Sequence, residues 1–136
     1  MKDLTPVNPK GEFFTMGMQS FRAKPAETRY NVIWIQWAAG HLSDEDFLAF
    51  LSECSKALSN DGVLVFKENV CGTGFIMDEE DSSITRSELQ YTALFVKGGF
   101  EVYHTGTQTN FPSELMKVRM WALRPAQSEA MAGAAE

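Results

Sequence analysis

Polar side chains that could do chemistry follow two strongly apolar stretches of the sequence. Gln36 and Trp37 close the run "YNVIWIQW", and His41 follows four residues after Trp37. Asn69 closes the second run, "VLVFKEN". An imidazole can accept a proton from an amine near neutral pH, an indole can hold a small ring or a cation, and an amide can orient a polar group. These residue types indicate a binding or proton-transfer site.

Each of these side chains also has an ordinary structural explanation. Trp37 would be a core aromatic residue, and Gln36 would be a hydrogen-bonded amide. A single His such as His41 is more often structural than catalytic, and Asn69 would suit a loop or cap. Both interpretations stay open from the residue types alone.

An acidic stretch, "MDEEDSS" (77–83), holds four consecutive carboxylates. With Asp78 and Asp81 three residues apart, it could form a pocket for a positively charged substrate side chain. The ordinary alternative is a solvated loop leading into a helix capped by Ser82 or Ser83. A metal site is less favoured, because the stretch lacks the alternating oxygens and distal Glu of a calcium loop.

The two buried runs are expected to be strands, because apolar residues without polar alternation are typical of strands covered on both faces. The strands expected in chain order are 11–18, 30–37, 63–69, 100–108 and 115–123, with the last two pairing antiparallel. Helices are expected over 42–62 and 84–99. The first has Ser43 as its N-cap and Gly62 as its stop, and the second buries Leu89, Ala93 and Val96.

This order predicts a mixed α/β sheet with a parallel strand–helix–strand unit. A right-handed crossover brings the ends of strands 30–37 and 63–69 to one edge of the sheet. Ligands of open α/β sheets bind outside the carboxyl ends of the strands. The polar residues therefore lie where such a fold keeps its site.

The charge, the cysteine count and the apolar content of the chain limit the partners and the compartment that we expect for it. The formal net charge of −6 argues against nucleic acid, which needs clustered Lys and Arg. Cys54 and Cys71 are too few for a disulfide framework, and we expect both to be inert. Without an apolar run long enough to span a bilayer, we expect a chain that does not bind membranes and lies in the cytoplasm, the nucleus or both.

The segments "YNVIWIQWAAGHLSDEDFLAFLSECSKAL", "NDGVLVFKEN" and "MDEEDSSITRS" resemble the protein α-N-terminal methyltransferases, a family of class I S-adenosylmethionine-dependent enzymes. The resemblance covers about residues 13–124. It implies methylation of the α-amine of proteins that begin X-Pro-Lys or X-Pro-Arg, with S-adenosyl-L-methionine as cofactor. It also implies a Rossmann-like methyltransferase sheet.

The resemblance also assigns roles to individual residues. The cofactor-binding residues would be Met18 and Gln19, along the adenine, and Gln36, near the methionine part of the donor. The substrate-binding residues would be Trp37, against the proline, Asn69, on the peptide backbone, and Asp78 and Ser83, in an acidic channel. His41 and Asp81 would be the candidate bases.

Two departures from the family are visible. Its members carry an upstream half, with a Gly-rich turn and an acidic residue that bind the donor, and this sequence starts after both. We therefore expect a sheet without its first two strands, in which "VIWIQW" is an exposed edge that disfavours folding in isolation. In "PSELMKV", the family commonly has an aromatic residue where Met116 stands.

The sequence thus predicts a partial methyltransferase domain over 1–124 and a disordered tail over 125–136. The alternative from another class is a non-catalytic remnant that binds X-Pro-Lys peptides. A third possibility is methylation of a different nucleophile, such as a small-molecule amine.

Overall fold

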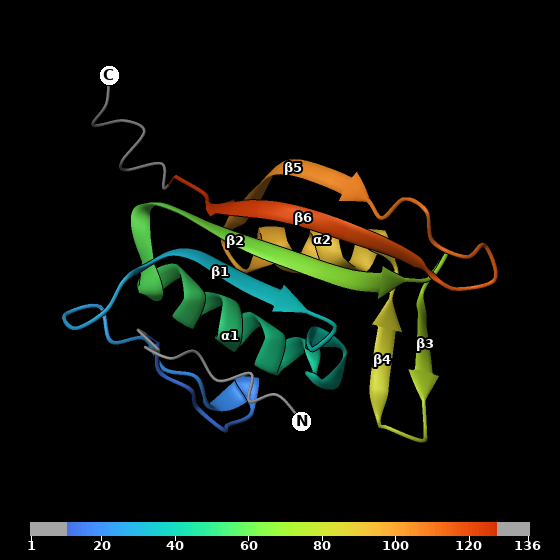
Figure 1. Cartoon of the computed structure of the whole chain (residues 1–136), viewed down its shortest axis with the longest axis horizontal. Helices are drawn as coiled ribbons and strands as arrows, with labels where there is room; N and C mark the ends of the chain where they lie inside the picture. The colour runs from blue at the N-terminus through green and yellow to red at the C-terminus, as the bar shows by residue number, and fades with distance from the viewer. Residues whose placement is uncertain (1–10, 128–136) are drawn as a thin grey trace, which may run out of the picture.

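A four-stranded sheet with strand order β1-β2-β6-β5 forms the centre of the computed structural model, which describes residues 11–127 (Figure 1). Its strands are β1 (Tyr30–Gln36), β2 (Leu58–Val70), β5 (Phe100–Thr107) and β6 (Lys117–Pro125). β1 and β2 run parallel, whereas β2 pairs antiparallel with β6, and β6 with β5. The expected parallel unit and the closing antiparallel pair are confirmed.

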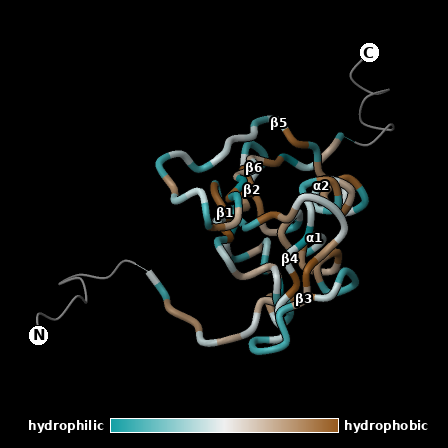
Figure 2. The backbone as a smooth tube through the Cα atoms, turned by 90° about the vertical axis from the view of Figure 1, so that its right-hand side faces the viewer, coloured by the Kyte–Doolittle hydropathy of each residue, from teal (hydrophilic) through white to brown (hydrophobic). Residues whose placement is uncertain are grey.

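Two helices cover one side of this sheet (Figure 2). They are α1 (Asp44–Ala57) and α2 (Glu88–Lys97). An aromatic cluster with ring centroids 5.2–6.1 Å apart fills the space between helices and sheet. Its members are Phe47, Phe66, Tyr91, Phe95 and Trp121. Aromatic side chains bury large apolar areas, so this cluster dominates the packing that fixes β2 and β6.

The start of α1 is as predicted, but its end is not. Ser43 caps the helix, with its Oγ accepting a hydrogen bond from the Asp46 backbone N–H at 3.1 Å. The helix ends at Ala57 and passes directly into β2, so Gly62 is not a helix stop. A Cβ at Gly62 would lie 2.9 Å from the Tyr30 carbonyl oxygen. Glycine is required here for the close approach of β1 and β2.

A β-hairpin occupies the end of the loop predicted over 70–83 and the start of the helix predicted over 84–99. Its strands are β3 (Phe75–Asp78) and β4 (Ser83–Arg86), and the hairpin extends away from the main sheet (Figure 1). The acidic residues are at its tip. α2 therefore begins at Glu88, and its cap is neither Ser82 nor Ser83 but Ser87, which forms a reciprocal capping box with Gln90.

The predicted buried face of α2 was wrong. Leu89 and Val96 are 80% and 64% exposed, whereas Tyr91, Leu94 and Phe95 are buried. Two large aromatic rings four positions apart remove more apolar area from water than the smaller Leu89 and Val96 would, so they decide which face packs on the sheet. The Gly98–Gly99 stop is confirmed, with Gly99 at φ +85°.

β1 forms an edge of the sheet and pairs with β2 alone in the described chain. Ile35 faces the helices and is buried, but Val32 and Trp34 are 56% and 57% exposed. The expectation that this strand is covered on both faces was therefore wrong, while the expected exposed edge is confirmed. One face and one edge of β1 are open.

The two ends of the described chain also differ from expectation. No strand forms over 11–18; a short 3-10 helix, η1 (Met18–Ser20), follows instead. β6 runs through Pro125, and the Ala126 N–H donates to the Gly99 carbonyl at 2.8 Å. The rest of the predicted tail, 128–136, and the lead-in, 1–10, lie outside the described residues. Within 11–127, neither helix is long and apolar enough to cross a bilayer.

Candidate active site

A pocket of about 490 Å³ opens where β1 and β2 end. The register pairs Gln36 with Lys67, so the polar strand ends lie side by side as predicted. The pocket contains five of the predicted site residues: Trp37, His41, Asn69, Asp81 and Ser83. Its other lining residues are Gly40, Glu68, Ile84, Thr85, Tyr91, Phe111, Leu115 and Met116. Residues from five separate parts of the chain thus converge on one site.

Trp37 is the first residue after β1 and has a strained backbone, with φ +50°. A left-handed conformation is unusual for a bulky residue, and it persists only where surrounding contacts enforce it. The Trp37 N–H donates to the Lys67 carbonyl at 3.0 Å, and its indole Nε1 donates to Asn69 Oδ1 at 3.2 Å. The Lys67 Nζ also lies 5.1 Å from the ring centroid. The ring is 48% exposed, so it is a pocket wall rather than a core residue.

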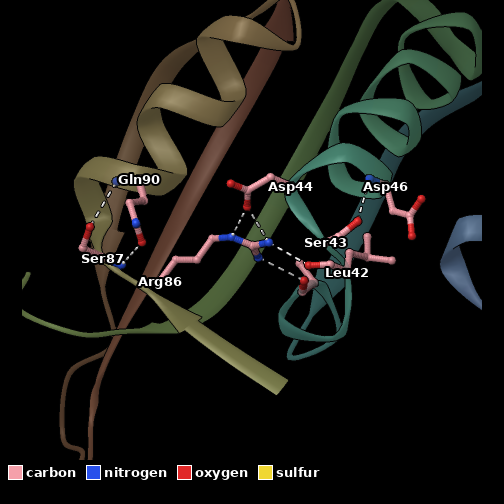
Figure 3. Close-up of polar contacts among 8 residues, drawn as sticks. Leu42, Ser43, Asp44, Asp46, Arg86, Ser87 and Gln90 are labelled. Atoms are coloured by element: carbon pink, nitrogen blue, oxygen red, sulfur yellow. Dashed lines mark hydrogen bonds and ion pairs between the residues drawn. The ribbon is translucent and has the colours of Figure 1, made fainter. Parts of the chain in front are cut away.

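His41 is the last residue of a second 3-10 helix, η2 (Ala39–His41). Arg86 of β4 binds the backbone of this segment through hydrogen bonds. The buried Arg86 guanidinium donates to the Ala39 carbonyl at 3.3 Å and to the Leu42 carbonyl at 2.7 Å. Its Nη2 also lies 2.9 Å from Asp44 Oδ1 (Figure 3). A planar guanidinium with five donors suits this task, because it can satisfy several acceptors at once.

Gly40 lets η2 pack directly on the hairpin. A Cβ at this position would lie 2.9 Å from the Ile84 carbonyl oxygen of β4, a distance that requires one of the two segments to move. The segment that carries His41 and the hairpin that carries Asp81 are therefore in backbone contact.

The acidic residues at the tip of the hairpin differ in their contacts and in their position relative to the pocket. Asp81 lines the pocket, and its Oδ1 accepts the Ser83 N–H at 2.9 Å. Hydrogen bonds from the Ser83 side chain and backbone, followed by the charge of His41, lower the pKa of Asp81. Asp78 is not among the lining residues, and its Oδ1 instead accepts the Glu80 N–H at 2.9 Å. Asp81 and Ser83 thus belong to the pocket, whereas Asp78 belongs to the outer hairpin.

A second, shallower cleft lies against β1, on the other side of the Gln36–Trp37 junction. Its lining residues are Met16, Gly17, Met18, Phe21, Ile33, Trp34, Ile35, Gln36, Ala38 and Phe50. Met18 and Gln36, both predicted to bind the donor, therefore line the same cleft, and Gln36 Oε1 accepts the Trp34 indole N–H at 3.1 Å. Gln19 is in η1 but is not among the lining residues.

This second cleft fits part of S-adenosylmethionine. A thioether and an indole suit the flat adenine ring, and the Gln36 amide suits the polar methionine part. None of the cleft residues is acidic, so the cleft offers no carboxylate for the ribose hydroxyls. The residues present fit a partial donor site.

Several pocket residues were not predicted from the sequence. Glu68 is 5% exposed, and its Oε1 accepts the N–H groups of Ala38 and Ala39, each at 3.0 Å. Burial raises the pKa of the Glu68 carboxyl, and the two amide hydrogen bonds, Arg86 and His41 offset part of that rise. Tyr91, Phe111 and Leu115 were also missed, whereas Met116 had been noted in "PSELMKV" as a departure from the family that affects one wall of the peptide channel. The S-x-x-Q pattern at 87–90 could have located the start of α2, and with it Tyr91.

The two cysteines differ in environment. Cys54 is fully buried on α1, and burial raises the pKa of its thiol to about 12. Cys71 lies beside the hairpin, where its Sγ is 3.4 Å from the Thr85 carbonyl oxygen. Neither lines the pocket.

Comparisons with known proteins identify the family and agree with the fold. The model of the AdoMet-dependent proline di-methyltransferase family matches residues 2–124. Alpha N-terminal protein methyltransferase 1 of Arabidopsis thaliana is 44% identical over 111 residues, which are 82% of this chain and 40% of that protein. N-terminal Xaa-Pro-Lys N-methyltransferase 1-B of Xenopus laevis is 41% identical over 114 residues, 84% of this chain and 50% of that protein.

Solved structures give the same result. A SAM-dependent methyltransferase from Leishmania major matches with a TM-score of 0.78 and 38% identity, over 84% of this chain and 45% of that one. At 10% identity, the Burkholderia thailandensis 1,6-didemethyltoxoflavin-N1-methyltransferase shares the fold alone, with a TM-score of 0.68 over 81% of this chain and 48% of that one.

The chain spans about half the length of the relatives that it matches. The match nevertheless covers nearly all of the described residues, including both clefts and the hairpin. This chain belongs to the AdoMet-dependent proline di-methyltransferase family.

Proposed function

We propose that this chain provides the peptide-binding and proton-accepting part of an S-adenosylmethionine-dependent methyltransferase that acts on the α-amine of X-Pro-Lys or X-Pro-Arg N-termini. The observation that carries this proposal is the convergence of Trp37, His41, Asn69, Asp81 and Ser83 on one pocket. The same kind of substrate appears in the name of the Xenopus laevis relative.

Each side chain has a physical reason for its proposed role. The exposed face of the Trp37 ring suits the flat, apolar proline ring at the second position. Asn69 accepts the Trp37 indole N–H through Oδ1, which leaves its NH₂ group to donate to a peptide carbonyl. Asp81 and Ser83 offer a negative charge and a hydroxyl to the cationic third residue.

The reaction requires a proton acceptor. An α-amine has an ordinary pKa of about 7.7–8.0, so at neutral pH most of it is protonated and has no lone pair for attack. When bound, S-adenosylmethionine supplies the methyl group. His41 takes the amine proton onto its imidazole, which leaves a neutral amine, and a positioned base of this kind contributes on the order of 10²–10⁴ in rate.

The two candidate bases are not equivalent. The hydrogen bonds from Ser83 lower the pKa of Asp81, which makes its carboxylate a weaker proton acceptor. We therefore assign the base to His41 and the binding of positive charge to Asp81. Asp78, outside the pocket, would contribute only to the long-range attraction of a cationic peptide.

A second function is favoured by the difference between the two clefts. The pocket where β1 and β2 end, here called the peptide-side pocket, is formed by several elements. The second cleft, against β1, here called the donor-side cleft, is open and lacks an acidic residue. On that basis the chain would bind X-Pro-Lys peptides without methyl transfer.

Calorimetric titration separates the two functions. The 136-residue chain is titrated with S-adenosylmethionine and then with an X-Pro-Lys peptide, and the matched controls are an X-Ala-Lys peptide and an N-acetylated X-Pro-Lys peptide. Binding of both ligands supports the enzyme, and methyl transfer should then be assayed. Peptide binding without donor binding favours the binding module, and no preference for the X-Pro-Lys peptide over its controls contradicts both.

Further proposals follow from the same assignment. We infer one partial methyltransferase domain over 1–124, in line with the family match over 2–124. The net charge of −6 favours cationic peptide partners over nucleic acid. The two free cysteines suit a reducing compartment, such as the cytoplasm or the nucleus.

A further inference from the structure

Glu68 is a buried charge without an ion-pair partner in the described chain. It is 5% exposed, and none of the ion pairs among residues 11–127 includes it. Burying a carboxylate is unfavourable unless hydrogen bonds compensate for the lost water. The compensation for Glu68 comes from two backbone amides, those of Ala38 and Ala39, which donate to the same oxygen.

These two amides belong to the turn that carries the site. Ala38 and Ala39 directly follow the strained Trp37, and Gly40 separates them from His41. From the other side, Arg86 binds the carbonyl oxygens of Ala39 and Leu42. A buried anion therefore holds the N–H groups of the turn while a buried cation holds its carbonyl groups. Glu68 is satisfied by two N–H groups of the turn, whereas Arg86 is satisfied by these carbonyl groups together with Asp44.

We propose that Glu68 is a positioning residue, which fixes the 37–41 turn so that Trp37 and His41 both face the pocket. The roles of Trp37 and His41 rest on the proposed function. The fixing of the 37–41 turn by Glu68 does not. The carboxylate acts on the turn through its Oε1, which accepts both the Ala38 and the Ala39 N–H. The next residue of β2, Asn69, holds the Trp37 indole, so consecutive residues of one strand secure the backbone and the side chain of the turn.

Three variants separate positioning from general stability. Glu68→Ala removes the acceptor, and Glu68→Asp keeps the charge but withdraws the oxygen by one methylene. Glu68→Gln keeps an acceptor oxygen at the original reach. The matched control is Glu53→Ala, because Glu53 Oε2 accepts the Ala23 backbone N–H at 2.9 Å and does not line the pocket.

The test is amide hydrogen exchange, measured by NMR on the full 136-residue chain without ligand. In Glu68→Ala and Glu68→Asp, exchange at Ala38 and Ala39 should accelerate by about ten-fold or more. Exchange at Leu51 and Phe95, in the core, should change no more than it does in the Glu53→Ala control. Glu68→Gln should remain close to wild type. Unchanged exchange at Ala38 and Ala39 in Glu68→Asp would overturn the proposal.

Peptide titration gives the second readout. If the wild-type chain binds an X-Pro-Lys peptide, Glu68→Asp should weaken that affinity by about ten-fold, and Glu68→Gln should restore it. Accelerated exchange with unchanged affinity would contradict the positioning of Trp37. If the wild-type chain does not bind the peptide, the proposed function fails, and the fixed turn is still decided by the exchange rates alone.

Discussion

The peptide-side pocket and the donor-side cleft share the Gln36–Trp37 junction but are built differently. Trp37 is held by a backbone hydrogen bond, an indole hydrogen bond and a cation, all from β2. The backbone of Trp34 pairs with β2, but its indole makes one hydrogen bond, to Gln36 two residues away, and Trp34 is 57% exposed. Contacts between distant segments therefore form the peptide-side pocket before any ligand binds. The donor-side cleft, in contrast, is largely one face of an edge strand.

Exchanging the two tryptophans for alanine tests this difference most directly. Trp37→Ala should weaken X-Pro-Lys binding by about 100-fold, because a central aromatic wall carries much of the energy of a small interface. Trp34→Ala should leave peptide affinity within about three-fold, because its ring lines the other cleft. Calorimetry measures both, and equal losses in the two variants would erase the distinction between the clefts.

Gly40→Ala should have the next largest effect. The new Cβ would meet the Ile84 carbonyl oxygen at 2.9 Å, so η2 and the hairpin must separate. We expect a loss of about 1–3 kcal/mol in the free energy of unfolding and about ten-fold weaker peptide binding. Gly72→Ala is the matched control, because a Cβ there meets nothing within 4 Å. Urea denaturation and peptide titration check both, and wild-type behaviour of Gly40→Ala would show that the pocket is not fixed.

The pH dependence of stability tests the buried anion of the pocket. Burial raises the pKa of Glu68 in the folded chain above its ordinary value of 4.5, despite the charges of Arg86 and His41. The folded chain therefore binds more protons than the unfolded chain between the two values, and this contribution to stability is lost as pH rises through the folded pKa.

Glu68→Gln should abolish that part of the decline. The measurement is urea denaturation of wild type and variant from pH 4.5 to 7, taken as the difference between the two chains. The difference cancels Glu53 and Asp81, whose lowered pKa values act in the opposite direction. A difference that does not vary with pH would contradict a raised Glu68 pKa.

The smallest expected effect concerns the exposed acids. Asp81→Asn should weaken the binding of a peptide with Lys at position three by about three-fold, and salt should reduce the loss, because exposed ion pairs are weak and screened. Asp78→Asn should change less, since Asp78 does not line the pocket. A larger loss for Asp78→Asn would place the cationic side chain on the outer hairpin instead.

Local signals predicted part of this molecule well. The apolar runs located β1 and β2, Ser43 located the start of α1, and the polar strand ends located the pocket. The hairpin was missed because its strands have only four residues each and because the acidic residues between them are typical of a loop. The buried face of α2 was missed because Leu89, Ala93 and Val96 also have helical spacing. The larger rings of Tyr91 and Phe95 lie on another face and pack on the sheet.

The hydrogen-bond partners of Glu68 could not have been predicted from the sequence. The pattern "KEN" (67–69) predicts a polar strand end. These three residue types alone do not indicate that the middle residue, Glu68, is buried. Its burial follows from strand alternation, since Leu64 and Phe66 point to the helices and Glu68 continues their side of β2. Its partners, the Ala38 and Ala39 amides, are set by the fold alone.

The three tryptophans give the chain a separate optical reporter for each region. Trp121 is 1% exposed in the aromatic core, whereas Trp37 faces the pocket and Trp34 the second cleft. Iodide should quench the fluorescence of the two exposed indoles and leave the emission of Trp121, and unfolding should shift that remaining emission to the red. Single-tryptophan chains would then report on the pocket, the second cleft and the core independently, without an attached dye.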